Sequence, residues 1–145
     1  MRIGDLCTRE AHCVSSDAPL AEAVREMHRR HVGALVVLGR GAAAGRPIGI
    51  VTDRDVLRAE MTRRADVFSL TAGEAMTADP LILEESCSLA QGVRRLGDRR
   101  VRRAPVIDAR GKLVGLISLD DVLPAVAESL TELAKLIGRQ SRLER

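Results

Sequence analysis

The chain has almost no aromatic residues: its 145 residues include one phenylalanine, no tryptophan and no tyrosine. Proteins that bind single-stranded nucleic acid usually stack the bases on aromatic side chains, so this scarcity disfavours that class. Long apolar runs are also missing. Stretches such as VGALVVLG are far shorter than the roughly 18 to 20 residues that span a bilayer, and MRIGDLCTRE does not have the form of a signal peptide. We therefore expect a cytoplasmic protein with no membrane contact.

Cysteine is scarce too, and three cysteines do not make a disulfide framework. Cys7 and Cys13, together with His12, His28 and His31, could be interpreted as soft metal ligands. None of the paired spacings typical of a zinc site is present, however, and the internal repeat described below aligns the cysteines with apolar residues. We therefore expect buried thiols and no metal site.

Catalytic motifs are absent from the sequence as well. It has no glycine-rich phosphate loop ending in lysine, no HExxH helix and no nucleophile turn. What the chain does have is a hydrophobic share of 46%, which is enough to build the core of a domain of this size. We expect a compact protein that is not an enzyme.

Positive charge is unevenly distributed along the chain. The net charge is +3, yet residues 94–103, RRLGDRRVRR, contain six arginines and one aspartate. Such a run attracts anions. Three interpretations are open: a solvated helix face, a site for a phosphorylated small molecule, and a nucleic-acid surface.

An internal repeat covers most of the chain. An offset of 69 residues aligns the two halves without a gap as far as Val37 and Val106, and beyond a glycine- and alanine-rich turn the offset is 66. Aligned identities include Gly4 with Gly73, Thr8 with Thr77, Leu20 with Leu89, Val24 with Val93 and Asp55 with Asp121. Because surface turns tolerate insertions, the change of offset is compatible with two copies of one unit.

Each copy is predicted to fold as β-α-β-β-α, since apolar residues recur at helical spacing after Pro19 and Ser88 and strand-like runs flank these helices. The predicted strands are residues 12–15, 34–38 and 47–51 in the first copy and 81–84, 104–108 and 113–117 in the second. The fold class is thus α/β, with two repeats packed through their sheets into one pseudo-symmetric module. We assign repeat 1 to residues 1–64, a linker to 65–72, repeat 2 to 73–123 and an amphipathic helix to 124–145.

Each copy ends in a strand that runs into a helix, GIVTDRDVL at residues 49–57 and GLISLDDVL at 115–123. Thr52 and Ser118 occupy the N-cap position, and Asp55 and Asp121 follow at the third helical position, which is the spacing of a capping box. Capping alone explains both copies. The same turn could also hold a nucleotide, because helix amides and a hydroxyl bind phosphate while a carboxylate accepts hydrogen bonds from ribose hydroxyls.

Together these features resemble a tandem pair of cystathionine beta-synthase (CBS) domains. The most specific segments are AMTADPLIL, the segment from GALVVL to PIGIVTDRDVL, and the segment from VRRAPVID to GKLVGLISLDDVL. Such pairs are regulatory modules that bind adenine nucleotides or related adenosyl compounds in clefts between the repeats, and they commonly form dimers. The resemblance therefore implies a homodimer, with AMP, ADP, ATP or S-adenosylmethionine as candidate ligands.

The resemblance also implies roles for individual residues. Asp55 and Asp121 would bind ribose, and the residues near the phosphate would be Thr52, Ser118, Arg102 and Arg103. The expected adenine walls are Cys13, Val32, Gly33 and Ala34 on the Asp121 side, and Ile82, Val101, Arg102 and Arg103 on the Asp55 side. Because the first set is small and the second bulky, we expect the Asp121 cleft to be the more open one.

The segment after residue 123 departs from the repeat. Pro124 lies too deep in the predicted helix for a starting position, so we expect it to kink or end that helix. Val126, Leu130, Leu133 and Ile137 then form an apolar stripe with charges opposite. The stripe would either fold back on the core of the chain or contact another subunit.

We predict a ligand-sensing regulatory module that needs no cofactor. The nucleotide would neutralise Arg102 and Arg103, connect the two repeats and shift their packing, which an unidentified protein partner would read. Two alternatives are a structural or interaction protein with empty clefts and a nucleic-acid-binding protein that uses residues 94–103. The scarcity of aromatic residues makes nucleic acid the least favoured partner.

Overall fold

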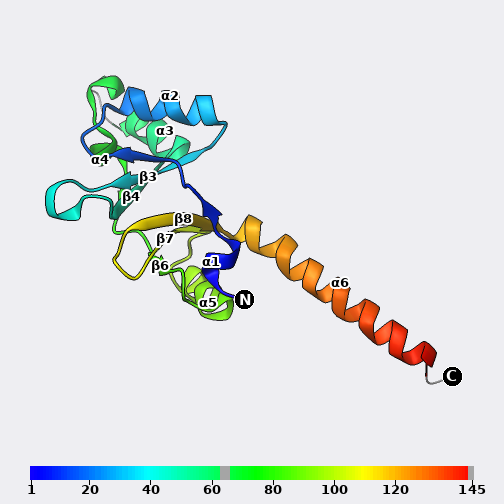
Figure 1. Ribbon diagram of the computed structural model, residues 1–145. Helices are drawn as coiled ribbons and strands as arrows, with labels where there is room; N and C mark the ends of the chain where they lie inside the picture. The colour runs from blue at the N-terminus through cyan, green and yellow to red at the C-terminus, as the bar shows by residue number, and fades with distance from the viewer. Residues whose placement is uncertain (63–65, 144–145) are drawn as a thin grey trace.

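The computed structural model describes residues 1–62 and 66–143, which form two four-stranded sheets with helices against them (Figure 1). One sheet has the strand order β2-β3-β4-β5 and the other β1-β8-β7-β6. The strands are β1 (Thr8–Arg9), β2 (Cys13–Ser15), β3 (Ala34–Leu38), β4 (Pro47–Thr52), β5 (Thr77–Ala78), β6 (Leu83–Glu84), β7 (Arg103–Ile107) and β8 (Leu113–Ser118). The predicted α/β class and the β-α-β-β-α order of each repeat are confirmed.

The helices follow from local capping and apolar spacing. The helices are α1 (Ile3–Leu6), α2 (Leu20–Arg30), α3 (Asp53–Thr62), α4 (Ala72–Ala75), α5 (Leu89–Asp98) and α6 (Leu119–Leu143), with short 3-10 turns η1 (Gly41–Ala43) and η2 (Val67–Ser69). Ser88 and Gln91 form a reciprocal capping box at the start of α5, which satisfies two helix-end amides. The sequence did not predict α1 and α4, which are one turn long. Within the described residues, no helix combines the length and apolarity needed to cross a membrane.

The two repeats match in the detail of their strand pairing. In the first, β3 and β4 are antiparallel and Ala34 faces Thr52; in the second, β7 and β8 are antiparallel and Arg103 faces Ser118. Each pair also has a register shift at the equivalent place, after Val37 and after Val106. The module is therefore pseudo-symmetric, as the repeat predicts.

The start of each repeat completes the sheet of the other repeat. Thr8 of β1 pairs with Leu116 of β8, and Thr77 of β5 pairs with Ile50 of β4. Ile3 accordingly lies fully buried in the core beneath the second sheet. The expected boundary between repeat 1 and the linker lies at residues 63–65, outside the described residues, and the proposed division of the chain stays a proposal. In space, the two sheets exchange strands.

Gly115 allows one of these exchanged strands to lie close. A Cβ atom added there would lie 2.7 Å from the carbonyl oxygen of Thr8 and 2.8 Å from Sγ of Cys7. We therefore expect Gly115→Ala to lower the free energy of unfolding by about 1 to 3 kcal/mol, measured by urea denaturation. Gly97 of α5 is the control, because a Cβ there meets no atom within 4 Å. Gly97→Ala should raise stability by up to about 1 kcal/mol. Equal stabilities for both variants would argue against the β1–β8 pairing.

Helix α6 leaves the body of the molecule and projects away from it (Figure 1). Of the two outcomes expected at Pro124, a kink or a helix end, the helix end is wrong, since α6 runs through Pro124 to Leu143. Proline removes the hydrogen bond to the carbonyl four residues earlier, and here that carbonyl belongs to Asp120 in the exposed first turn, so the loss is small.

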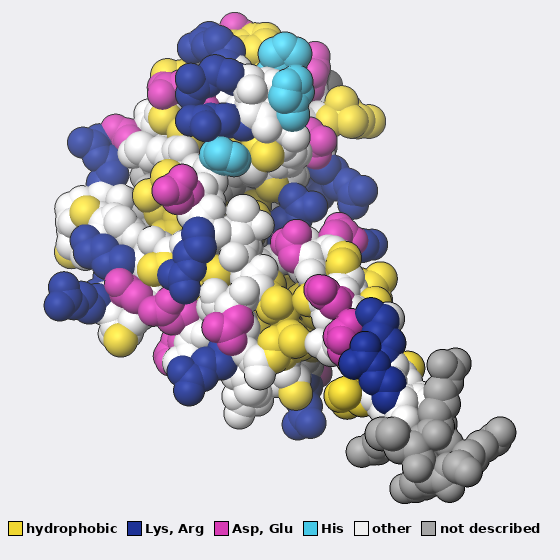
Figure 2. All heavy atoms as spheres, turned by 45° about the vertical axis from the view of Figure 1, so that its right-hand side comes forward, with side chains coloured by type: hydrophobic (Ala, Val, Ile, Leu, Met, Phe, Trp, Pro, Cys, Tyr) yellow, Lys and Arg dark blue, Asp and Glu magenta, His cyan; other side chains and the backbone are white. Residues whose placement is uncertain are grey.

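Folding back of the apolar stripe on the described chain is also excluded. Leu130, Leu133 and Ile137 are 62%, 55% and 67% exposed, and only Val126 packs against the second core. Apolar, acidic and basic side chains lie next to one another along the part of the helix visible in Figure 2.

Candidate functional site

The turn at the end of the first repeat is a complete capping arrangement. Thr52 ends β4, and Asp55 lies in the first turn of α3. The amide and hydroxyl of Thr52 both donate to Asp55 Oδ2 at 3.0 Å, and the Asp55 amide donates back to the Thr52 hydroxyl at 3.1 Å. Asp55 is 6% exposed. The structural role expected for this pair is thus present, and its carboxylate also faces a cavity.

The equivalent turn of the second repeat is more open. Ser118 ends β8 and Asp121 lies in the first turn of α6, but Asp121 is exposed. Its Oδ2 accepts one hydrogen bond, from the Ser118 amide at 3.2 Å. Within the described residues its other oxygen has no hydrogen-bond partner. Two carboxylates that are equivalent in the repeat therefore differ in their surroundings.

A cavity of about 690 Å³ lies at Asp55, between the two repeats. Its volume is typical of sites for small organic ligands. The lining comes from β4 and α3 of the first repeat and from β5 and the segment before β7 of the second. The lining residues are Gly33, Ile50, Thr52, Asp53, Arg54, Asp55, Arg58, Thr77, Ala78, Asp79, Pro80, Arg99, Val101, Arg102 and Arg103. A molecule bound here would contact both repeats.

The lining of this cavity is cationic, with five arginines against three aspartates. Three of the arginines are already paired: Arg58 with Asp55 at 3.5 Å, Arg99 with Asp79 at 3.6 Å, and Arg102 with Asp120 at 2.9 Å. The two others, Arg54 and Arg103, have no ion pair or side-chain hydrogen bond with the described part of the chain. Unpaired guanidinium groups at a cavity are well suited to a phosphate, which they bind in bidentate fashion.

Six of the residues expected at the clefts line this cavity: Gly33, Thr52, Asp55, Val101, Arg102 and Arg103. The others lie elsewhere: Cys13 in β2, Val32 after α2, buried Ala34 in β3, Ile82 before β6, and Ser118 with Asp121 at the start of α6. We expected Gly33 at the Asp121 cleft, and the structure instead has it at Asp55.

The Asp55 side contains a cavity in spite of its bulky arginines, and the expectation that the Asp121 cleft is the more open of the two stays a prediction. The side chain of Arg102, which is one of the lining residues, is 73% exposed and pairs with Asp120 of α6. Arg58 and Thr77 line the cavity but were not expected there, whereas Arg99 belongs to the arginine run for which a phosphorylated ligand was one interpretation. Thr77 could have been found, because it matches Thr8 in the repeat, whereas Arg58 matches Pro124 and has no such signal.

The arginine run of residues 94–103 divides between two places. Arg94 and Arg95 line a separate cavity of about 440 Å³ beside Cys87, and Arg95 donates to the carbonyl of Ile82 at 3.0 Å. Arg99, Arg102 and Arg103 line the Asp55 cavity. The run therefore does not serve one site.

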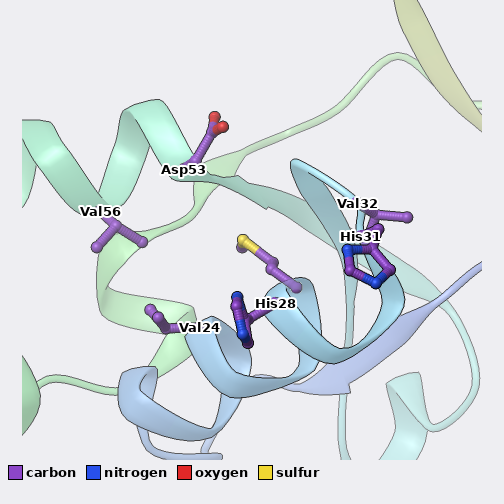
Figure 3. A pocket seen from close by; sticks show the side chains of 7 residues that line it. Val24, His28, His31, Val32, Asp53 and Val56 are labelled. Carbon is purple, nitrogen blue, oxygen red and sulfur yellow. The ribbon is translucent and has the colours of Figure 1, made fainter.

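A third cavity, of about 370 Å³, lies between α2 and α3 and is lined by valines, Met27, two histidines and Asp53 (Figure 3). The rings of His28 and His31 are 6.5 Å apart. The described residues contain no group of three or more His, Cys, Asp and Glu side chains that could hold a metal ion. Desolvation and the charge of Glu26 raise the pKa of the Cys13 thiol, which disfavours the thiolate that binds metal. That no metal is bound stays a prediction.

A family model for the CBS domain matches residues 3–62 and again residues 72–128. The chain belongs to the CBS domain family. It is 31% identical over 125 residues to the CBS domain-containing protein CBSX3, mitochondrial, of Arabidopsis thaliana. That match covers 84% of this chain and 60% of the relative, so this chain spans about three fifths of the relative's length.

Solved structures of CBS-pair proteins share the fold. The structure of CBSX2 in complex with AMP has a TM-score of 0.73 and 26% identity, and the match covers 88% of this chain and 96% of that one. The structure of Hypoxic Response Protein I with two coordinated zinc ions has a TM-score of 0.74 and 27% identity, with coverages of 86% and 98%. The similarity to an AMP complex supports nucleotide sensing as the general role of such modules.

Proposed function

We propose that this CBS pair is a regulatory module that binds an adenosine nucleotide in the Asp55 cavity. The observation that carries the proposal is the lining, which combines a ribose-type carboxylate, Asp55, with the unpaired guanidinium group of Arg103 between the two repeats. AMP in the similar CBSX2 structure supports the same ligand class. An open cavity whose lining combines a carboxylate with arginines supports the binding of an anionic ligand that carries a sugar.

The proposed signal passes from the phosphate to helix α6. Arg102 reaches from the cavity rim to Asp120 in the first turn of α6, and the two are joined at 2.9 Å. A phosphate that draws Arg102 inward competes with Asp120 for it. Ligand binding would thus favour a different position of α6, and a partner that contacts α6 would read the change.

The charge of the cavity favours phosphorylated ligands among the four candidates. AMP, ADP and ATP bring anionic groups to the five arginines, whereas S-adenosylmethionine has no phosphate and carries a sulfonium cation. We also propose that the protein forms a homodimer and acts on an unidentified protein partner.

Two alternatives to the nucleotide-sensor proposal are a structural protein with empty clefts and a nucleic-acid-binding protein. One experiment distinguishes the three.

Calorimetry and thermal shifts with purified protein provide that experiment. We expect AMP, ADP or ATP to bind and to raise the melting temperature, S-adenosylmethionine to bind more weakly, and duplex and single-stranded oligonucleotides not to bind at physiological salt. Binding of none of these ligands would favour the structural alternative. Tight oligonucleotide binding that weakens steeply with salt would favour the nucleic-acid alternative.

A further inference from the structure

Thr77 makes one of the contacts that distinguish the Asp55 turn from the Asp121 turn. It lies on the exchanged strand β5, which pairs with β4, and its hydroxyl donates to Asp55 Oδ1 at 3.2 Å. Nη1 of Arg58 lies 3.5 Å from the same oxygen. Asp55 Oδ2 meanwhile accepts the two hydrogen bonds from Thr52.

Most of the acceptor capacity of Asp55 is therefore used inside the protein. A carboxylate offers about four acceptor positions, and the Thr52 amide, the Thr52 hydroxyl and the Thr77 hydroxyl occupy three of them, while the Arg58 guanidinium forms an ion pair with Oδ1. The one position left cannot accept from both hydroxyls of a ribose. A ribose that presents two hydroxyls to Asp55 must displace a partner. Among the neutral donors to Asp55, the Thr77 hydroxyl makes the weakest hydrogen bond, since 3.2 Å is long for an O–H···O hydrogen bond.

The second sheet has the equivalent threonine without the same contact. Thr8 of β1 faces Leu116 of β8, as Thr77 of β5 faces Ile50 of β4, and these pairs are equivalent in the repeat. In the described part of the chain, however, the Thr8 side chain makes no hydrogen bond to Asp121. Asp121 is exposed and keeps free acceptor positions.

We propose that Thr77 is a specificity-determining residue that competes with ribose for Asp55 and so makes the two clefts unequal. This inference rests on the proposed nucleotide function. Because the competing hydroxyl belongs to the strand exchanged between repeats, a bound ribonucleotide releases β5 from Asp55. Occupancy of the cavity is thereby linked to the contact between the two repeats.

The test compares Thr77→Val with Thr8→Val, both in an Asp121→Asn background that weakens ribose binding in the other cleft. Valine keeps the shape of threonine and removes the hydroxyl. We expect Thr77→Val to tighten AMP binding about two- to tenfold in calorimetry, because one competing hydrogen bond is lost. Affinity for 2′,3′-dideoxy-AMP, which has no ribose hydroxyls, should not change. Thr8→Val should change neither affinity.

Thr77→Ser serves as the conservative variant in the same background. It keeps the hydroxyl, so it should bind AMP as tightly as the parent protein, which carries Asp121→Asn alone. The inference is overturned if Thr77→Val binds AMP no more tightly than the parent, or if it gains equally for AMP and the dideoxy ligand. If neither the parent nor the wild-type chain binds AMP, the proposed function fails first and the inference falls with it. Melting curves confirm that each variant is folded.

Discussion

Replacing Arg102 and Arg103 together by alanine should weaken AMP binding about 10- to 100-fold while adenosine binding changes less than about twofold. Both arginines line the Asp55 cavity, and Arg103 has no other ion pair within the described residues. A charge-assisted hydrogen bond to phosphate is lost with each side chain, whereas adenosine has no phosphate to lose. Neither side chain is part of the core, so the fold should persist. Titration calorimetry with both ligands measures the difference.

Arg94→Ala with Arg95→Ala is the matched control for this result. These arginines belong to the same sequence run but line a different cavity, so nucleotide affinity should not change. A loss as large as that of the Arg102 and Arg103 variant, together with tight oligonucleotide binding at physiological salt, would contradict the sensor proposal. The oligonucleotide affinity would then fall with a slope of roughly 0.9 per phosphate neutralised on duplex DNA.

Asp55→Asn should weaken AMP binding in the cavity by about 10- to 100-fold and leave 2′,3′-dideoxy-AMP nearly unaffected. Asparagine keeps an oxygen that can accept from Thr52, so the cap is largely preserved, but it removes the charge that strengthens hydrogen bonds from ribose. The lost interaction with the helix dipole should lower stability by no more than about 1 kcal/mol. Calorimetry with the two ligands separates these effects.

Asp121→Asn tests the other cleft in the same way. If that cleft also binds ribose, its AMP affinity should fall by a similar factor, with no change at the Asp55 cavity. Folded Asp55→Asn and Asp121→Asn proteins that both bind AMP as the wild type does would mean that the two aspartates serve only as helix caps.

Local patterns in the sequence were sufficient to predict the main helices and strands of each repeat. The apolar spacing after Ser88 predicts α5, and the strand-like runs at residues 47–51 and 113–117 predict β4 and β8, because side-chain periodicity depends on near neighbours. The repeat predicts the pseudo-symmetry for the same reason. The capping role of Thr52 and Asp55 also follows from their spacing alone.

The exchange of β1 and β5 could not be predicted in this way. Each strand has two residues, too few for a periodic signal, and its partner lies more than twenty residues away for β5 and more than a hundred for β1. The continuation of α6 through Pro124 likewise depends on where the helix leaves the body, since the carbonyl that loses its partner lies in the exposed first turn.

The sequence by itself therefore determined the two repeats, their element order and the chemistry of the candidate site: a carboxylate, a hydroxyl and arginines. Only the tertiary structure decided which of these residues meet. It brings Gly33, Arg58 and Arg99 to the Asp55 cavity, and it gives Asp55 a contact with Thr77 that Asp121 does not have with Thr8. The physical reason is that side chains respond to neighbours distant in the chain, so identical repeat positions acquire different partners once the two sheets exchange strands.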